Sequence, residues 1–156
     1  PIAAFGGKKE IMELLSPLGK VYQAGTLCGN PTSVIAGQTA LDTLIEGRNT
    51  IYKQLRDFGD EIRKGISNIL QERKVEAQIC GLESMFQIFF TNKKITDYDS
   101  ALSSDKTKFM CYHQKLLKTG IFVPPGQFET CFISTAHTYQ DMDKTLEAID
   151  SAIKTL

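Results

Sequence analysis

The sequence has no net charge, no closely spaced pair of cysteines and no long hydrophobic run, and each absence excludes a class of protein. The 18 Lys and Arg residues balance 18 Asp and Glu residues, so no net field attracts a nucleic-acid backbone or an anionic membrane. The apolar runs, such as residues 88–90, are far shorter than the ~20 residues of a membrane-spanning helix. We therefore expect the partner to be a small molecule or another subunit.

The chain of 156 residues, 42% of them hydrophobic, has the length and composition of an ordinary globular protein with a core. Its four cysteines lie far apart and away from both histidines, which predicts a reduced, cytoplasmic protein with no bound metal. The first residues contain neither an initiator Met nor a signal-peptide pattern. We therefore expect a fragment or a processed product.

The first part of the chain has the pattern of an α/β layer. Residues 2–5 are an apolar run closed by two glycines, typical of a short buried strand, and residues 8–16 predict a short helix. A glycine-rich loop then leads to Asn30, a suitable N-cap, and to Pro31 at the first helical position. The helix that starts there is expected to break near Gly47.

A second, long helix is predicted after Asn49. Apolar residues recur along it every three or four positions, which places them on one stripe while charged residues face water. This stripe consists of Ile51, Leu55, Phe58, Ile62, Ile66 and Ile69.

The remainder of the chain predicts a small α+β domain with an antiparallel sheet. Residues 75–80 and 85–91 have strand patterns, and Phe86, Ile88 and Phe90 alternate with Gln87 in the second run. Two more strands are expected at residues 121–123 and 129–135.

Helices complete this domain in the order ββαββα. One is predicted at residues 105–119, and Thr138 and Asp141 have the spacing of a capping box that opens the last helix. We therefore divide the chain into a remnant of a large α/β domain (1–46), a connector helix (47–74) and the small C-terminal domain (75–156).

No complete catalytic motif is present: the sequence contains no GxSxG, HExxH, P-loop or GxGxxG. Gly25 and Thr26 lie in a loop just before a helix, where N–H groups and a hydroxyl suit a phosphate, although a simple turn is the alternative. Glu129 stands next to an apolar strand. It is either a functional carboxylate or a solvent-facing residue at a strand edge. His113 and His137 are interpreted as a helix-surface residue and a loop-network residue.

Two longer strings carry a resemblance to a known family. Residues 21–31 read VYQAGTLCGNP and resemble the YQAGTLSGNP segment of glutamate-1-semialdehyde aminomutases, and residues 128–138, FETCFISTAHT, resemble that family's FEAxFxSxAHT pattern. The similarity runs in order along the whole chain, over roughly the last third of the family's length. The chain departs from the family at Cys28 and Gly126, where Ser is usual.

The resemblance implies that the chain is the C-terminal part of a fold-type I pyridoxal-phosphate transferase. The complete enzyme would be a homodimer with its sites at the subunit interface. The resemblance also implies pyridoxal 5'-phosphate or pyridoxamine 5'-phosphate as the cofactor. Thr26, with the backbone of Gly25, would bind the cofactor phosphate of the neighbouring subunit, and Glu129 would face the amino end of the substrate. The Schiff-base lysine of the family corresponds to a position upstream of Pro1, so the fragment alone is expected to be inactive.

The activity implied is an isomerase reaction that converts glutamate-1-semialdehyde to 5-aminolevulinate for porphyrin (tetrapyrrole) biosynthesis. Two alternatives stay open. One is another class III ω-aminotransferase, which uses an external amino acceptor, and the other is a small regulatory ligand-binding module formed by residues 75–156.

Overall fold

The structure is a computed structural model that describes residues 2–156. The chain forms two compact units, residues 1–48 and residues 49–156, which are described one at a time. In the described residues, no helix is both long enough and apolar enough to cross a membrane.

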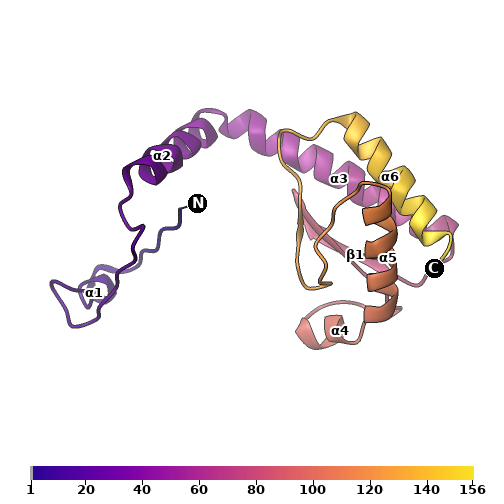
Figure 1. Cartoon of the computed structure of the whole chain (residues 1–156), viewed down its shortest axis with the longest axis horizontal. Coiled ribbons are helices and arrows are strands. Elements are labelled where there is room, and N and C mark those ends of the chain that lie inside the picture. The colour runs from indigo at the N-terminus through magenta and orange to yellow at the C-terminus, as the bar shows by residue number, and fades with distance from the viewer. Residues whose placement is uncertain (1) are drawn as a thin grey trace. The chain divides into compact units, whose positions relative to one another are not determined.

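The first unit contains two helices, the short α1 (Lys9–Met12) and the longer α2 (Pro31–Glu46) (Figure 1). The Asn30 side chain accepts a hydrogen bond from a backbone N–H in the first turn of α2 at 3.0 Å. Pro31 occupies the first helical position and Gly47 follows the last. The predicted start and end of this helix are therefore confirmed.

The predicted strand at residues 2–5 is wrong. These residues form no regular element, and Ile2 and Phe5 remain 56% and 63% exposed. A strand is held by hydrogen bonds to a neighbouring strand, and in the described part of this unit no strand lies beside them. The predicted helix at residues 8–16 shrinks to the single turn of α1.

Helix α3 (Arg48–Glu72) carries the predicted apolar stripe into the core of the second unit. Phe58, Ile62 and Ile66 are buried there, as is Leu70 one turn further on. The amphipathic pattern is therefore confirmed, and α3 contributes its buried face to the packing of residues 49–156.

The sheet of the second unit consists of β1 (Gln78–Leu82), β2 (Met85–Phe89) and β3 (Cys131–Phe132). All pairing is antiparallel in the order β1-β2-β3, which confirms the predicted antiparallel sheet. Residues 121–123 form no strand, so the predicted ββαββα order is wrong. A single short strand at the edge of the sheet takes the place of the expected pair.

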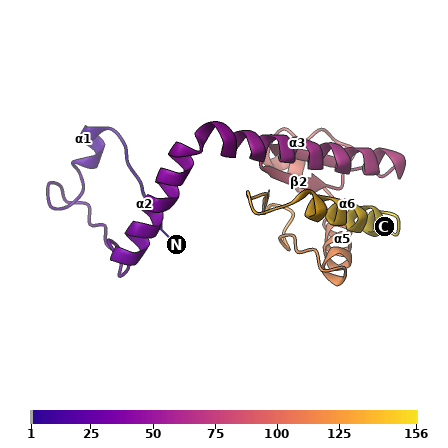
Figure 2. The same ribbon diagram turned by 90° about the horizontal axis from the view of Figure 1, so that it is seen from above.

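Three helices complete this unit, namely α4 (Tyr98–Leu102), α5 (Lys106–Lys118) and α6 (Tyr139–Ile153). The capping box of α6 is confirmed, because the Thr138 N–H donates to Asp141 Oδ2 at 2.8 Å and the Asp141 N–H donates to Thr138 Oγ1 at 3.2 Å. Helices α3 and α6 run side by side (Figures 1 and 2).

One face of the sheet packs against α3, α5 and α6. As the alternation predicts, Phe86, Ile88 and Phe90 of the second strand region all point into this core. The most completely buried large side chains come from every layer: Phe109, Ile66, Ile88, Leu116 and Ile149.

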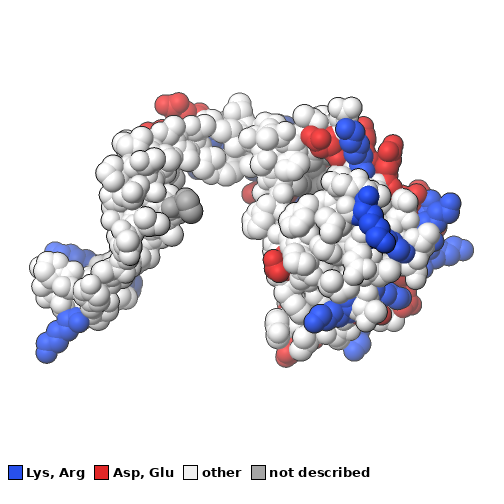
Figure 3. Space-filling model, viewed as in Figure 1, with Lys and Arg blue, Asp and Glu red and all other residues white. Residues whose placement is uncertain are grey.

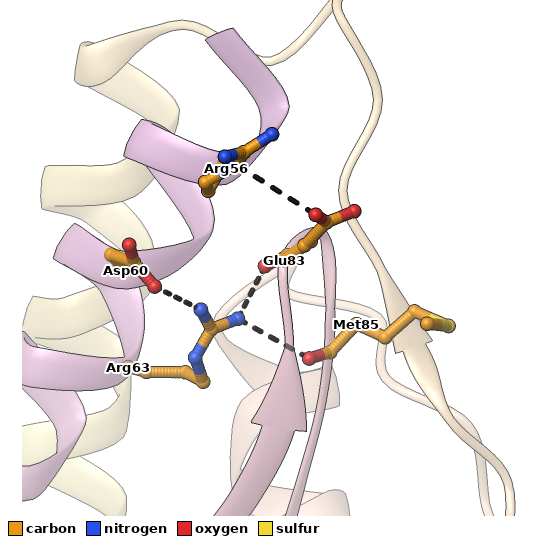
Figure 4. Close-up of polar contacts among 5 residues, drawn as sticks. All are labelled: Arg56, Asp60, Arg63, Glu83 and Met85. Atoms are coloured by element: carbon orange, nitrogen blue, oxygen red, sulfur yellow. Dashed lines mark hydrogen bonds and ion pairs between the residues drawn. The ribbon is translucent and has the colours of Figure 1, made fainter. Parts of the chain in front are cut away.

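Helix α3 lies so close to the β1–β2 turn that a side chain at Gly59 has no room. A Cβ at this position would overlap the carbonyl oxygen of Glu83. One turn further along, Arg63 Nη1 donates to the carbonyl oxygens of Glu83 and Met85, and Nη2 donates to Asp60 (Figure 4). Arg56 Nε also pairs with Glu83 Oε1 at 3.7 Å, so the helix and the hairpin tip are joined by close backbone approach and by two guanidinium groups.

We expect Gly59→Ala to lower the free energy of unfolding of the chain by roughly 1–3 kcal/mol. Overpacking against a fixed backbone carbonyl outweighs the gain of ~1 kcal/mol for Gly to Ala in a helix. Gly65→Ala in the same helix is the matched control, since its Cβ would meet the movable methyl groups of Leu146, at 2.7 Å from Cδ1. Urea unfolding followed by circular dichroism measures both variants, and an equal loss in both would contradict the account.

An ion pair joins the end of α3 to α6. Arg73 Nε donates to Asp150 Oδ1 at 2.7 Å and Arg73 Nη2 donates to Asp150 Oδ2 at 2.6 Å. These hydrogen bonds and the positive charge of Arg73 hold the pKa of the Asp150 carboxyl below its ordinary value of 3.8. The carboxylate form of Asp150 is therefore favoured by folding.

The stability of the chain should consequently depend on the charge of Asp150. Because its pKa is lowered by folding, its contribution is present above pH 3.8 and is lost as the pH falls through the depressed value. We expect Asp150→Asn to be less stable than the parent at neutral pH and to approach it in acid. Asp143→Asn, on the same helix, is the control, and a parent–variant difference independent of pH would contradict this role.

Candidate functional site

The loop before α2 places Gly25 and Thr26 in a turn next to the start of that helix. The Cys28 N–H donates to the carbonyl oxygen of Gly25 at 2.9 Å, and the Asn30 N–H donates to that of Leu27 at 3.1 Å. A Cβ at Gly25 would lie 3.1 Å from Cys28 Sγ. The chain is therefore tightly turned where it leads into the helix.

The hydrogen-bond donors at this turn do not include a charged side chain. Thr26 is exposed, and its hydroxyl makes no hydrogen bond within residues 2–156. No Lys or Arg occurs between Lys20 and Arg48, and Figure 3 shows largely uncharged surface along α2. The donor set consists of a hydroxyl, backbone N–H groups and the N-terminus of a 16-residue helix, which carries about half a positive charge. These groups fit a phosphate.

A surface hollow of about 490 Å³ lies beside the same turn, within the first unit. It is lined by the exposed apolar residues 2–5 together with Gly25, Asn30 and Ser33, among others. Polar backbone and side-chain groups thus adjoin apolar surface, as is usual where a small organic molecule binds.

Glu129 lies in a turn of the second unit and not in a strand. Its N–H donates to the carbonyl oxygen of Gly126 at 2.9 Å, which closes the turn two residues before β3 begins. The side chain is exposed to solvent. The strand predicted to start at Glu129 is shortened by this turn.

Neighbouring side chains hold the two central residues of the turn in place. The side chain of Gln127, 6% exposed, accepts a hydrogen bond from Ser104 Oγ at 3.1 Å. The ring of Phe128 packs against the rings of Tyr98 and Phe89, with centroids 5.3 and 6.4 Å apart. Glu129 is therefore exposed on a turn whose other side chains are anchored.

The two histidines differ from each other. His137 is part of a loop network, as predicted, and its Nδ1 accepts a hydrogen bond from the Ser134 N–H at 3.0 Å. His113 was expected on a helix surface, but it is buried in α5 and its ring nitrogens have no partner in the described chain. Helical spacing alone did not reveal which side of α5 other segments cover.

The cysteines supply no nucleophile near Glu129. All four are free thiols, and burial raises the pKa of Cys131, the cysteine nearest Glu129 in sequence, to about 11. The thiolate is the reactive form of cysteine, so Cys131 stays protonated at neutral pH. Within residues 2–156, no group of His, Cys, Asp and Glu is arranged to hold a metal ion.

The candidate residues divide between the two units. Gly25 and Thr26 share one turn in the first unit, whereas Glu129 belongs to the second. The structure describes a phosphate-suited turn and an exposed carboxylate, each in its own setting. Known proteins similar to the chain show the family to which the chain belongs.

The sequence pattern of the aminotransferase class-III family matches residues 1–153. The chain belongs to the class III aminotransferase family. A glutamate-1-semialdehyde 2,1-aminomutase from Methanosphaera stadtmanae is 45% identical to the chain over 156 residues, and one from Nitrosopumilus maritimus is 44% identical over 155. The alignment with the first covers 100% of the chain, and the chain spans 36% of the length of that relative.

Solved structures share the fold of the chain. An ω-transaminase from Sphaerobacter thermophilus matches 96% of the chain with a TM-score of 0.84 at 25% identity, over 34% of its own length. A glutamate-1-semialdehyde aminomutase from Pseudomonas aeruginosa in complex with PMP matches 86% of the chain with a TM-score of 0.72 at 16% identity, over 30% of its own length. The chain therefore has part of the fold-type I architecture, as the resemblance implied.

Proposed function

We propose that the chain is the C-terminal part of a glutamate-1-semialdehyde 2,1-aminomutase. The observation that carries this proposal is the 45% identity over all 156 residues to a relative of that name. Because the chain spans about a third of such relatives, the activity belongs to the complete protein. That protein would convert glutamate-1-semialdehyde to 5-aminolevulinate in tetrapyrrole synthesis by moving the amino group from C2 to C1.

The cofactor of this reaction is pyridoxal 5'-phosphate or its pyridoxamine form, which supplies the electron sink for amino transfer. In the chain, Gly25 and Thr26 would hold the cofactor phosphate through a backbone N–H and the unpaired hydroxyl. The start of α2 adds its dipole to this site. With no Lys or Arg between Lys20 and Arg48, this segment would bind the phosphate by hydrogen bonds alone.

Glu129 would bind the amino end of the substrate. Its carboxylate is exposed and has no ion-pair or hydrogen-bond partner in the described residues, so it is available to a cationic ligand. An ammonium group is the partner that a carboxylate on an anchored turn favours. None of the lysines in this chain matches the Schiff-base lysine of the family, which the complete protein would supply.

We also propose that the complete protein is a cytoplasmic homodimer in which Gly25 and Thr26 bind the phosphate of the neighbouring subunit's cofactor. This part of the proposal rests on the family resemblance of residues 21–31. A dimer that combines one Thr26→Ala subunit with one subunit lacking the lysine would reveal whether the turn acts across the interface.

An assay of the complete protein separates the aminomutase from an ω-aminotransferase. The substrate of an aminomutase contains both the donor carbon and the acceptor carbon, so no second amino acid or keto acid is needed. We expect 5-aminolevulinate to form from glutamate-1-semialdehyde alone. Product formation only after addition of a keto acid would refute the proposal and favour the ω-aminotransferase.

Thr26→Ala in the complete protein should weaken cofactor retention more than it slows turnover of the loaded enzyme. A hydrogen bond to a charged group is worth roughly 1.5–3 kcal/mol, and the phosphate would anchor the cofactor without taking part in the bond changes of amino transfer. Thr39→Ala is the matched control, since the Thr39 hydroxyl donates to the Ile35 carbonyl of its own helix at 2.9 Å. Equal cofactor affinity of the two variants, measured by equilibrium dialysis, would remove Thr26 from the phosphate site.

A further inference from the structure

Gln87 is a polar residue in the centre of the sheet, on the face that the core helices do not cover. Its neighbours Phe86 and Ile88 point into the helix-covered core, so the alternation of the strand turns Gln87 to the opposite side. It is nevertheless only 8% exposed. The cover over Gln87 includes the turn of residues 126–129, which its side chain contacts.

The amide of Gln87 holds both ends of that turn. Gln87 Nε2 donates to the carbonyl oxygen of Glu129 and, at 3.5 Å, to that of Gly126. Gln87 Oε1 accepts from the Ile88 N–H at 2.9 Å. If the amide were flipped, Gln87 Oε1 would face the two carbonyl oxygens, which are acceptors and cannot donate to it. The pattern of donors and acceptors therefore fixes the orientation of the amide.

The conformation of this turn also determines where the Glu129 carboxylate lies. A Cβ at Gly126 would be 2.8 Å from Glu129 Oε1, so the carboxylate folds back over the residue whose carbonyl oxygen Gln87 holds. A displacement of this turn by the loss of the Gln87 amide would therefore move the carboxylate as well. Loss of this donor is costly at the Glu129 carbonyl oxygen, which would be left without it, whereas the Gly126 carbonyl oxygen still accepts the Glu129 N–H at 2.9 Å.

We infer that Gln87 is a positioning residue for Glu129: it fixes the turn from which the carboxylate is presented to the substrate. This inference rests on the proposed role of Glu129 as the group that binds the substrate's amino end. Gln87 is only 8% exposed, and its side-chain amide contacts the backbone of the turn. It acts through the backbone of residues 126–129, and sequence patterns give no sign of this role.

A double-mutant cycle in the complete protein tests the inference. The variants are Gln87→Met, which keeps the length of the side chain and removes the amide, Glu129→Gln, and the double variant. Gln78→Met is the matched control, because Gln78 also links a strand to a distant loop, donating to the Lys93 carbonyl and accepting from the Ile95 N–H at 3.3 Å. Steady-state kinetics with glutamate-1-semialdehyde, cofactor occupancy and melting temperature are measured for each variant.

We expect Gln87→Met to lower kcat/KM by roughly threefold to tenfold, mainly through KM, as the loss of one or two hydrogen bonds implies. In the Glu129→Gln background the same substitution should change kcat/KM by less than about twofold, since the carboxylate it positions is gone. The loss of melting temperature should be the same in both backgrounds. Gln78→Met should lower the melting temperature and leave KM unchanged.

The outcomes separate the two proposals. Unchanged kinetics of Glu129→Gln would overturn the proposed role of Glu129, and with it the inference. If Glu129→Gln lowers kcat/KM, two results would overturn the inference alone. One is an unchanged kcat/KM of Gln87→Met, and the other is a loss of kcat/KM from Gln87→Met that is equally large in the double variant. If Gln87→Met does not fold, Gln87→Asn, whose amide is one methylene short of the turn, takes its place under the same criteria.

Discussion

The close contact between helix α3 and the β1–β2 turn determines the rest of the second unit. Gly59 lets the helix backbone approach the turn, and Arg63 binds the carbonyl oxygens there. From the same turn, the Ser84 carbonyl oxygen accepts the Ile133 N–H at 2.9 Å, which seats β3 against the hairpin. Since Glu129 precedes β3 by two residues, the helix–hairpin contact fixes the strand that continues from the candidate site.

The two candidate sites are stabilised in different ways. The turn of Glu129 lies on a packed sheet, with Gln87, Gln127 and Phe128 each held by named contacts. In the first unit, none of the described residues is buried, and the turn at Thr26 is held by backbone hydrogen bonds and by the capped start of α2. Its geometry therefore depends on local chain chemistry, with little contribution from side-chain packing.

Local signals explain which predictions from the sequence are confirmed. Asn30 and Pro31 define a helix start through nearby backbone groups, and the alternation around Phe86 defines a strand face, so both could be predicted from a few adjacent residues. The strands expected at residues 2–5 and 121–123 failed because a strand requires a partner elsewhere in the chain. The contact of Gln87 with a turn some 40 residues away likewise depends on tertiary packing.

In the proposed enzyme, the second unit presents Glu129 to the amino end of the substrate from a turn held by Gln87. The most direct test is a crystal structure of the complete protein with its cofactor and an amine that mimics the substrate. We expect Gln87 Nε2 to donate still to the Glu129 carbonyl oxygen while the carboxylate lies about 3 Å from the ligand's amino nitrogen. A carboxylate directed away from the ligand, with the amino group bound by other residues, would contradict it.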